Sequence, residues 1–236
     1  MKSLLIPGLA FSFLLWVNCP VRPGENPTAA GENAAAVKIG DKVTLSPPPA
    51  KGHLSLEESL WLRRSIRSFT DQPLTWDQIG RLLWAAQGVN RPGTGGRTSP
   101  SAGATYPLET YVVLPDGVYK YLPPEHAAQK VVSGEMRQIL REAGLGSDSA
   151  QPSPCVLIFT AVFERTVAKF GKDAYPYVYL EAGHAAQNVL LEAAALGLGA
   201  VPNGSILGYG SKKPLGLPRG EDVVYILIIG YPKAEN

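Results

Sequence analysis

The spacing of apolar and polar residues predicts helices at two places near residue 60 and residue 80. Ser55-Leu-Glu-Glu58 is a capping box, in which a hydroxyl and a carboxylate bond the backbone amides at a helix start, and it predicts a helix through Trp61. Thr75-Trp-Asp-Gln78 is a second capping box. The helix after it repeats apolar residues at positions i, i+3, i+4 and i+7 until Gly88. Those apolar residues are Ile79, Leu82, Leu83 and Ala86.

Runs of β-branched and aromatic residues predict four strands. Residues 109–114 and 118–122 flank a Pro-Asp-Gly turn and are typical of a hairpin. Residues 155–163 and 223–229 are nearly continuous apolar runs, which predict strands that are buried on both faces.

Two further amphipathic helices are expected between these strands. One runs from Met136 to Ala143 and stops at Gly144. The other is long and rich in alanine, with Pro176 in its first turn, and it reaches Leu196. The pattern therefore predicts helices and strands around one sheet, with no internal repeat.

The N-terminal residues differ from the rest of the chain. Lys2 precedes an apolar run from Leu4 to Val17, which is short for a membrane span and typical of a signal-peptide core. We expect residues 1–19 to direct export to the periplasm or cell envelope, with membrane tethering by an uncleaved or lipidated segment as the alternative. Residues 20–52 are rich in Pro, Gly and Ala and predict a linker or arm, so the folded domain is expected at residues 53–236.

Composition excludes several functional classes. The 236 residues are 45% hydrophobic, which suits one domain with a sizeable core. A net charge of +2 gives no strong field for nucleic acid. Two cysteines and three widely spaced histidines predict neither a disulfide scaffold nor a metal site.

Three segments have the residue types that bind phosphate or a planar ring. The arginine segment, residues 63–67, places three guanidinium groups around one hydroxyl and can clamp a phosphate, or it is a solvated basic surface. The PSAG loop, residues 97–107, is rich in small residues that allow close backbone approach to a planar ligand, or it is an ordinary loop. Residues 197–204 leave the long helix through glycines, which present backbone groups to a ring edge or cap the helix. The chain has neither a G-x-G-x-x-G fingerprint nor a P-loop, which argues against a Rossmann NAD site or an NTPase.

The order of these segments resembles the SagB-type dehydrogenases of the nitroreductase superfamily. The stretches that carry the resemblance include SLEESLWLRRSIRSF (55–69), RTSPSAGATYPLETYVV (97–113) and YLEAGHAAQNVLLEAAALGLGAV (179–201). The resemblance extends over residues 45–233. It implies an α+β fold with a central, mostly antiparallel sheet flanked by helices, and an interlocked homodimer with FMN at the subunit interface.

The resemblance also implies three groups of FMN-binding residues. Contacts to the phosphate and the pyrimidine edge are expected from Arg63, Arg64, Ser65 and Arg67, with Lys233 as a further phosphate candidate. Contacts from the other subunit are expected from Ser101, Ala102 and Gly103. The isoalloxazine ring is expected to be lined by Gln187, Gly199, Ala200 and Val201.

The activity implied is ping-pong transfer of two electrons through flavin N5, between a donor and a small aromatic or quinone-like substrate. NAD(P)H is the usual donor in the superfamily, although an exported protein would meet little of it. Peptide azoline dehydrogenases of this branch carry a Lys-Tyr pair where this chain has Lys169-Phe170, so proton abstraction would depend on Lys169 alone. Lys169 is therefore a candidate catalytic residue or a surface lysine, and azoline oxidation or a non-catalytic flavin-binding module stay open as alternatives.

Overall fold

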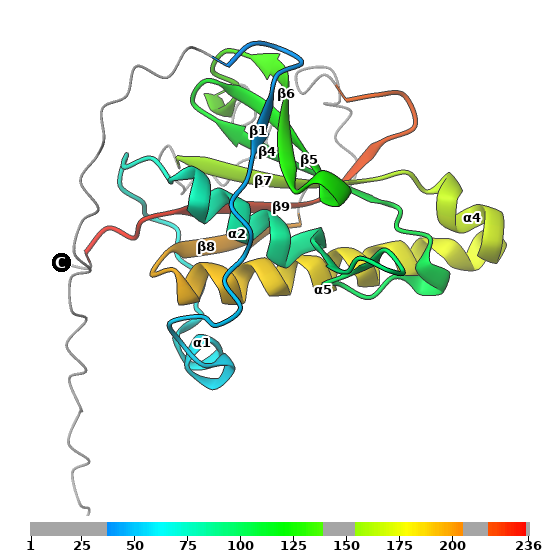
Figure 1. Cartoon of the computed structure of the whole chain (residues 1–236), viewed down its shortest axis with the longest axis horizontal. Coiled ribbons are helices and arrows are strands. Elements are labelled where there is room, and N and C mark those ends of the chain that lie inside the picture. Colours follow the sequence, from blue (N-terminus) through cyan, green and yellow to red (C-terminus); the bar gives the residue numbers. More distant parts are fainter. Residues whose placement is uncertain (1–36, 139–153, 205–216, 235–236) are drawn as a thin grey trace, which may run out of the picture. The chain divides into compact units, whose positions relative to one another are not determined.

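The computed structural model describes residues 37–138, 154–204 and 217–234, and these residues fold around one antiparallel sheet (Figure 1). The sheet has seven strands in the order β1-β6-β5-β4-β7-β9-β8. In that order the strands are Lys42–Thr44, Ala127–Ser133, Gly117–Leu122, Leu108–Leu114, Cys155–Ala161, Asp222–Gly230 and Gly199–Asn203. The expected antiparallel sheet with flanking helices is thus confirmed.

Two helices, α2 (Trp76–Gln87) and the 22-residue α5 (Ala174–Ala195), cover one face of this sheet. Two shorter helices, α1 (Leu56–Leu62) and α4 (Glu164–Phe170), pack against α5. Helix α2 packs beside α5, while α1 and α4 contact α5 near opposite ends (Figure 1). A small hairpin, β2 (Val89–Arg91) with β3 (Gly96–Arg97), leads into the 3-10 turn η1 (Ala102–Ala104); η2 is Pro123–Glu125 and η3 is Gly171–Asp173. No helix among the described residues is long and apolar enough to span a bilayer.

Both predicted capping boxes form. The Glu58 amide donates to Ser55 Oγ at 3.1 Å, and the Ser55 amide donates to the Glu58 carboxylate at 2.7 Å. Thr75 and Gln78 make the same reciprocal pair at 3.2 and 3.0 Å. Helix α2 ends at Gln87, with Gly88 as its C-cap, as the pattern predicts.

The predicted strands form as well. Strands β4 and β5 make the hairpin, with Leu114 opposite Gly117. Every residue of β7 is buried, because β7 lies between β4 and β9 with side chains packed on both of its faces. The long helix also follows the pattern, since Val178, Ala182, Ala185, Val189 and Ala193 are all buried.

Other elements were not predicted by the pattern. Strand β1 lies inside the 20–52 segment expected to be a linker or arm, and it pairs with β6. The glycine-rich exit of α5 forms β8, an edge strand, which is a position that tolerates Pro202. The signal-peptide residues 1–19 lie outside the described residues, as does most of the helix expected from Met136 to Ala143.

Candidate functional site

The arginine segment runs along the edge of the sheet beside β8. Ser65 forms a parallel bridge with Ala200, and the Ile66 amide donates to the Ala200 carbonyl at 3.1 Å. On the C-terminal side, the Lys233 amide donates to the Ser68 carbonyl at 3.0 Å. Backbone hydrogen bonds therefore join three parts of the expected FMN site that are far apart in sequence.

Four basic residues gather along this edge. Arg64, Arg67 and Lys233 are exposed, and Arg63 is half-buried. Within residues 37–138, 154–204 and 217–234, neither Arg63 nor Arg67 makes an ion pair. A phosphate with two negative charges is the ligand that such guanidinium groups bind through charge-assisted hydrogen bonds. These residues fit the phosphate of FMN.

Strand β8 offers its backbone rather than its side chains to a ligand. A Cβ on Gly199 would lie 2.8 Å from the Cβ of Ile66, so glycine is required there by the close approach of the arginine segment. Ala200 and Val201 are both buried, on opposite faces of the sheet. Any contact of these three residues with a cofactor ring is consequently made by main-chain atoms.

The PSAG loop has a strained backbone. Ala104 and Tyr106 adopt positive φ angles of 54° and 45°, a region that residues with a Cβ rarely occupy, and Gly103 lies at 58°. Ser101 holds the turn, because its hydroxyl accepts a hydrogen bond from the Tyr106 amide at 2.9 Å and its carbonyl accepts one from Ala104 at 3.0 Å. Strain of this kind concentrates at ligand-binding segments.

Helix α4 clamps this loop from outside. The hydroxyls of Thr105 and Thr166 are 2.9 Å apart, and Arg165 donates to the Tyr106 carbonyl at 2.9 Å. The Lys169 ammonium is exposed and donates to the Gly103 carbonyl at 3.0 Å. The structure thus brings Lys169 to the PSAG loop.

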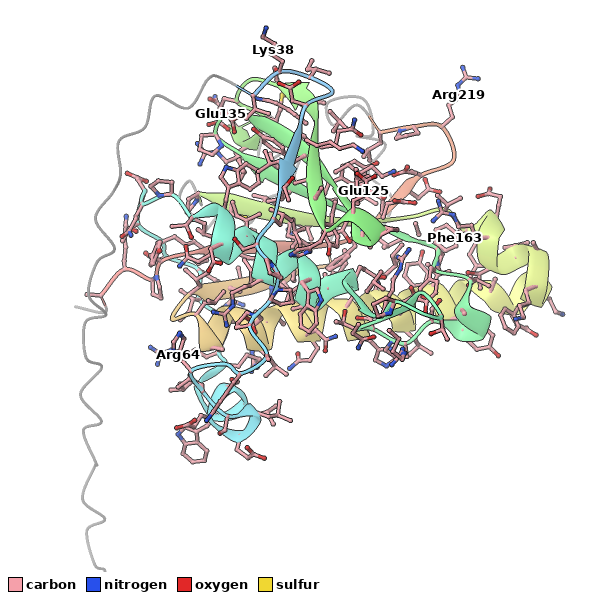
Figure 2. The ribbon with its side chains drawn as sticks, viewed as in Figure 1. Lys38, Arg64, Glu125, Glu135, Phe163 and Arg219 are labelled. Atoms are coloured by element: carbon pink, nitrogen blue, oxygen red, sulfur yellow. The ribbon has the colours of Figure 1, made fainter. Side chains whose placement is uncertain are left out.

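The PSAG loop and the arginine segment lie at opposite ends of α5. The loop packs near Glu181, whereas β8 begins just after Leu196, 15 positions later, which corresponds to roughly 22 Å of helix. Figure 2 labels Arg64 beside α1 and Phe163, which precedes α4, at the other end of α5. Gln187 is exposed between them. One subunit therefore does not bring together the two halves of the site that the resemblance implies.

Glu181 is a candidate functional residue that sequence reasoning missed. It is 3% exposed, it lines a cavity behind the PSAG loop, and its Oε1 atom has no hydrogen-bond partner among the described residues. Burial raises the pKa of Glu181 to about 7, although Ser101, Arg97 and Gln87 act in the opposite direction. The sequence did contain a sign of this burial, because Glu181 is a charged residue directly before Ala182 on the apolar face of α5.

The raised pKa of Glu181 makes stability depend on pH. The folded protein favours the protonated carboxyl of Glu181. The stability that this preference contributes is fully present below pH 4.5, the ordinary pKa of a glutamate, and is lost as pH rises through about 7. Glutamine cannot ionise, so the variant keeps its stability as pH rises while wild type loses some. We therefore expect the unfolding free energy of Glu181→Gln minus that of wild type to increase by on the order of 2–3 kcal/mol from pH 4.5 to pH 8. Denaturant unfolding of both proteins at several pH values measures this gain, and parallel pH curves would contradict it.

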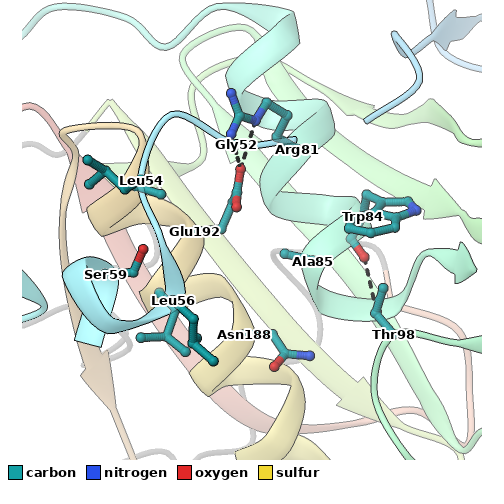
Figure 3. A pocket seen from close by; sticks show the side chains of 12 residues that line it. Gly52, Leu54, Leu56, Ser59, Arg81, Trp84, Ala85, Thr98, Asn188 and Glu192 are labelled. Atoms are coloured by element: carbon teal, nitrogen blue, oxygen red, sulfur yellow. Dashed lines mark hydrogen bonds and ion pairs between the residues drawn. The ribbon is translucent and has the colours of Figure 1, made fainter. Parts of the chain in front are cut away.

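A second hollow of about 330 Å³ lies between α1, α2 and α5 (Figure 3). The polar side chains that line it are paired. Arg81 contacts the Glu192 carboxylate at 2.7 Å, and the Thr98 hydroxyl donates to the Trp84 carbonyl at 3.0 Å. Asn188 donates to Ser99 at 3.2 Å. These contacts hold α5 against α2. Each of the polar side chains just named has a partner, so this hollow offers none of them to a ligand.

The sheet, the basic edge and the strained loop together define an α+β protein with basic residues gathered at one edge of its sheet. Comparison with known proteins makes the class specific. The sequence model of the nitroreductase family matches residues 62–231. The chain belongs to the nitroreductase family, a family of oxidoreductases whose members generally bind a flavin, usually FMN.

Individual relatives agree with this membership. The chain is 40% identical over 173 residues to a protein of Methanocaldococcus jannaschii provisionally named a nitroreductase, covering 71% of this chain and 86% of the relative. It is 28% identical over 131 residues to the microcin B17-processing protein McbC of Escherichia coli, covering 51% and 48%. A solved structure from Ralstonia eutropha, also provisionally named a nitroreductase, superposes with a TM-score of 0.75 at 31% identity, covering 86% of this chain and 97% of that one. The nitroreductase-like fold implied by the resemblance is confirmed.

Proposed function

We propose that this protein is an FMN-dependent oxidoreductase of the SagB-type branch, which passes two electrons between a donor and a small organic substrate in a ping-pong cycle. The observation that carries the proposal is the basic edge, where the Ile66 amide donates to the Ala200 carbonyl and the Lys233 amide donates to the Ser68 carbonyl. When bound, FMN supplies hydride transfer at N5.

The chain's own residues would bind and orient this cofactor. Arg63, Arg64 and Arg67 would hold the phosphate and the pyrimidine edge, with Lys233 beside them. Cations near the pyrimidine edge of the flavin would also stabilise the negative charge that a reduced flavin carries. The backbone of β8 and the exposed Gln187 would line the ring, while Ser101, Ala102 and Gly103 would reach it from the partner subunit.

A homodimer is part of the same proposal. Four of the seven residues of α1 are large, apolar and exposed, and Trp61 among them is 90% exposed. The first half of α5 exposes Tyr175, Tyr177, Tyr179 and Leu180. Apolar surface of this kind on a folded domain is typical of a subunit interface. Pairing of two copies would also let the PSAG loop of one meet the arginine segment of the other.

The absorption spectrum of the purified protein tests the proposal. We expect a yellow protein with the bands of bound flavin, about one FMN per subunit, and a dimeric mass by light scattering. Anaerobic reduction by NADH, NADPH or dithionite, then reoxidation by candidate acceptors, would identify the half-reactions. A colourless protein that cannot be reconstituted with FMN would overturn the proposal.

Two other functions share this site. A flavin-binding or sensing module would bind FMN and show no turnover. A peptide azoline dehydrogenase is favoured by the similarity to McbC and by the contact of Lys169 with the Gly103 carbonyl, which holds an ammonium group at the PSAG loop. Phe170 removes the phenol that would assist Lys169 in proton abstraction, so we rank this activity below general flavin-dependent reduction.

Lys169→Ala separates these functions. We expect flavin content to stay unchanged, because Lys169 is assigned no FMN contact, and turnover of quinone-like acceptors to fall less than threefold. An azoline dehydrogenase would lose most of its rate with this substitution. Stopped-flow rates for both substrate classes provide the measurement. Lys172→Ala, at an exposed lysine in η3, is the matched control. Loss of azoline oxidation in Lys169→Ala alone would reverse our ranking.

Export to the periplasm or cell envelope remains part of the proposal, supported by Lys2 and the apolar run from Leu4 to Val17. In that compartment NAD(P)H is scarce, so the electron donor would be another reductant. Fractionation of the native host, with antibody detection of the mature chain, tests the location. Full-length protein confined to the cytosol would contradict it.

A further inference from the structure

Tyr106 has an unfavourable backbone conformation at the point where the PSAG loop enters β4. Its φ angle is 45°, in a region that residues with a Cβ rarely occupy. The next residue is Pro107, whose ring favours an extended backbone with negative φ in the residue before it. A conformation of this kind costs roughly 1–3 kcal/mol and persists only where surrounding contacts enforce it. The contacts of Tyr106 therefore decide whether the loop keeps this course.

Two contacts on Tyr106 come from within the PSAG loop. The Tyr106 amide donates to Ser101 Oγ at 2.9 Å, and the Arg97 guanidinium lies over the Tyr106 ring, 4.4 Å from its centroid. Both partners belong to residues 97–107, the same segment as Tyr106 itself. These contacts shape the loop, but they do not attach its exit to the seven-stranded sheet.

Arg165 of α4 makes that attachment. One arm of its guanidinium donates to the Tyr106 carbonyl at 2.9 Å, and the other arm donates to Glu109 Oε1, on β4, at 2.6 Å. The Glu109 side chain is only 15% exposed, so solvent screens this ion pair in part. A guanidinium holds its N–H groups in a rigid planar fork, so the bond to Glu109 aims the first arm at the carbonyl. A rotation of the peptide that turned this carbonyl away would break the bond.

Glu109 is itself fixed by a network of alternating charges. Its Oε2 atom pairs with Lys120 at 3.2 Å, and Lys120 pairs with Glu221 at 3.3 Å. Glu221 is buried and accepts a hydrogen bond from the Tyr111 hydroxyl at 2.8 Å. From Arg165 to Glu221 the network contains two cations and two carboxylates, so their charges balance. Glu109 is thus held between two cations and cannot move toward the loop without losing one of them.

We propose that Arg165 is a positioning residue, which Glu109 aims at the Tyr106 carbonyl and which holds the PSAG loop in the conformation that receives its ligand. Arg165 acts through the loop backbone and is assigned no contact with cofactor or substrate. That the ligand is FMN rests on the function proposed above. The ordered loop is the part of this inference that can be measured without any ligand.

Hydrogen exchange of the full chain, prepared without flavin, tests this role by mass spectrometry or NMR. The amides of Ala104 and Tyr106 report opening of the loop, because both are hydrogen-bonded to Ser101. The amides of β7 report unfolding of the whole domain, since β7 is a buried central strand. Arg165→Ala should lower the protection of the loop amides about tenfold relative to the β7 amides, because it removes a hydrogen bond from a charged donor. Using this ratio excludes a change in global stability.

Two further variants make the test specific. Glu109→Gln is nearly isosteric and removes the charge that aims the guanidinium, so it should lower the same ratio several-fold even if Arg165→Ala does not fold. Lys120→Ala is the matched control, because it breaks ion pairs of the same network and leaves the fork of Arg165 in place. It should lower stability without lowering the ratio. An unchanged ratio in either variant at the fork, or an equal fall in Lys120→Ala, would overturn the inference.

Titration of the same proteins with FMN separates this inference from the proposed function. Because only the ordered loop binds, the dissociation constant for FMN should rise several-fold in Arg165→Ala and stay near the wild-type value in Lys120→Ala. Wild type that binds no FMN, with the ratio lowered at Arg165, would retain the positioning role and overturn the flavoenzyme proposal. Wild type that binds FMN, with either an unchanged ratio or an unchanged FMN affinity in Arg165→Ala, would overturn the positioning role alone.

Discussion

Arg64→Ala should weaken FMN binding by roughly 10- to 150-fold, equivalent to 1.5–3 kcal/mol, the usual range for a hydrogen bond to a charged group. Arg64 is exposed beside the end of α1, where backbone bonds to Ala200 and Lys233 fix the course of the chain (Figure 2). The substitution removes a charge without removing any of these backbone bonds. Fluorescence titration of the apoprotein with FMN measures the affinity.

Arg219→Ala is the matched control for this measurement. Arg219 is another exposed arginine, located before β9 and away from the arginine segment (Figure 2). The control removes the same charge from the whole protein, so a general electrostatic effect would weaken both variants equally. Equal affinities for Arg64→Ala and wild type would remove Arg64 from the proposed phosphate site.

Complementation between two defective subunits is the second large effect that we expect. One subunit type carries Arg64→Ala with Arg67→Ala, and the other carries Ala102→Glu, which places a carboxylate in the PSAG loop. Each variant alone should bind little FMN. If each site takes its arginine segment from one subunit and its PSAG loop from the other, a mixed dimer contains one intact site and one site with both defects.

Random reassociation makes half of the dimers mixed, so FMN content should recover to about one quarter of the wild-type value. Absorbance at the flavin bands after joint refolding measures this fraction. Mixing the double arginine variant with Lys233→Ala is the control, since both defects fall on the same half of the site and neither site of the mixed dimer is intact. No recovery with Ala102→Glu would show that a single subunit supplies both segments.

Local signals in the sequence predicted a large part of this fold. The two capping boxes at Ser55 and Thr75 set where α1 and α2 begin, because their hydrogen bonds involve residues only three positions apart. The apolar runs of β7 and β9 were also recognisable, since central strands are buried on both faces. The arginine segment and the PSAG loop were recognised by residue type and order.

Features that depend on distant contacts were not predictable in this way. Strand β1 has three residues and no apolar alternation, so only its pairing with β6 defines it. Strand β8 contains Gly199 and Pro202, which are poor strand formers, and its pairing with β9 compensates for them. Glu181 looked like an ordinary charged residue of a helix, because its burial comes from the PSAG loop rather than from its neighbours in sequence.

The bridge between Ser65 and Ala200 has a consequence for aggregation. Strand β8 is the last strand of the sheet, and an uncovered last strand presents unpaired amides and carbonyls to which another chain can add. The arginine segment, through Ser65 and Ile66, occupies part of the outer side of β8. A cofactor that holds the arginines in place would therefore also shield the sheet from intermolecular strand addition, and loss of flavin should be accompanied by a greater tendency to precipitate.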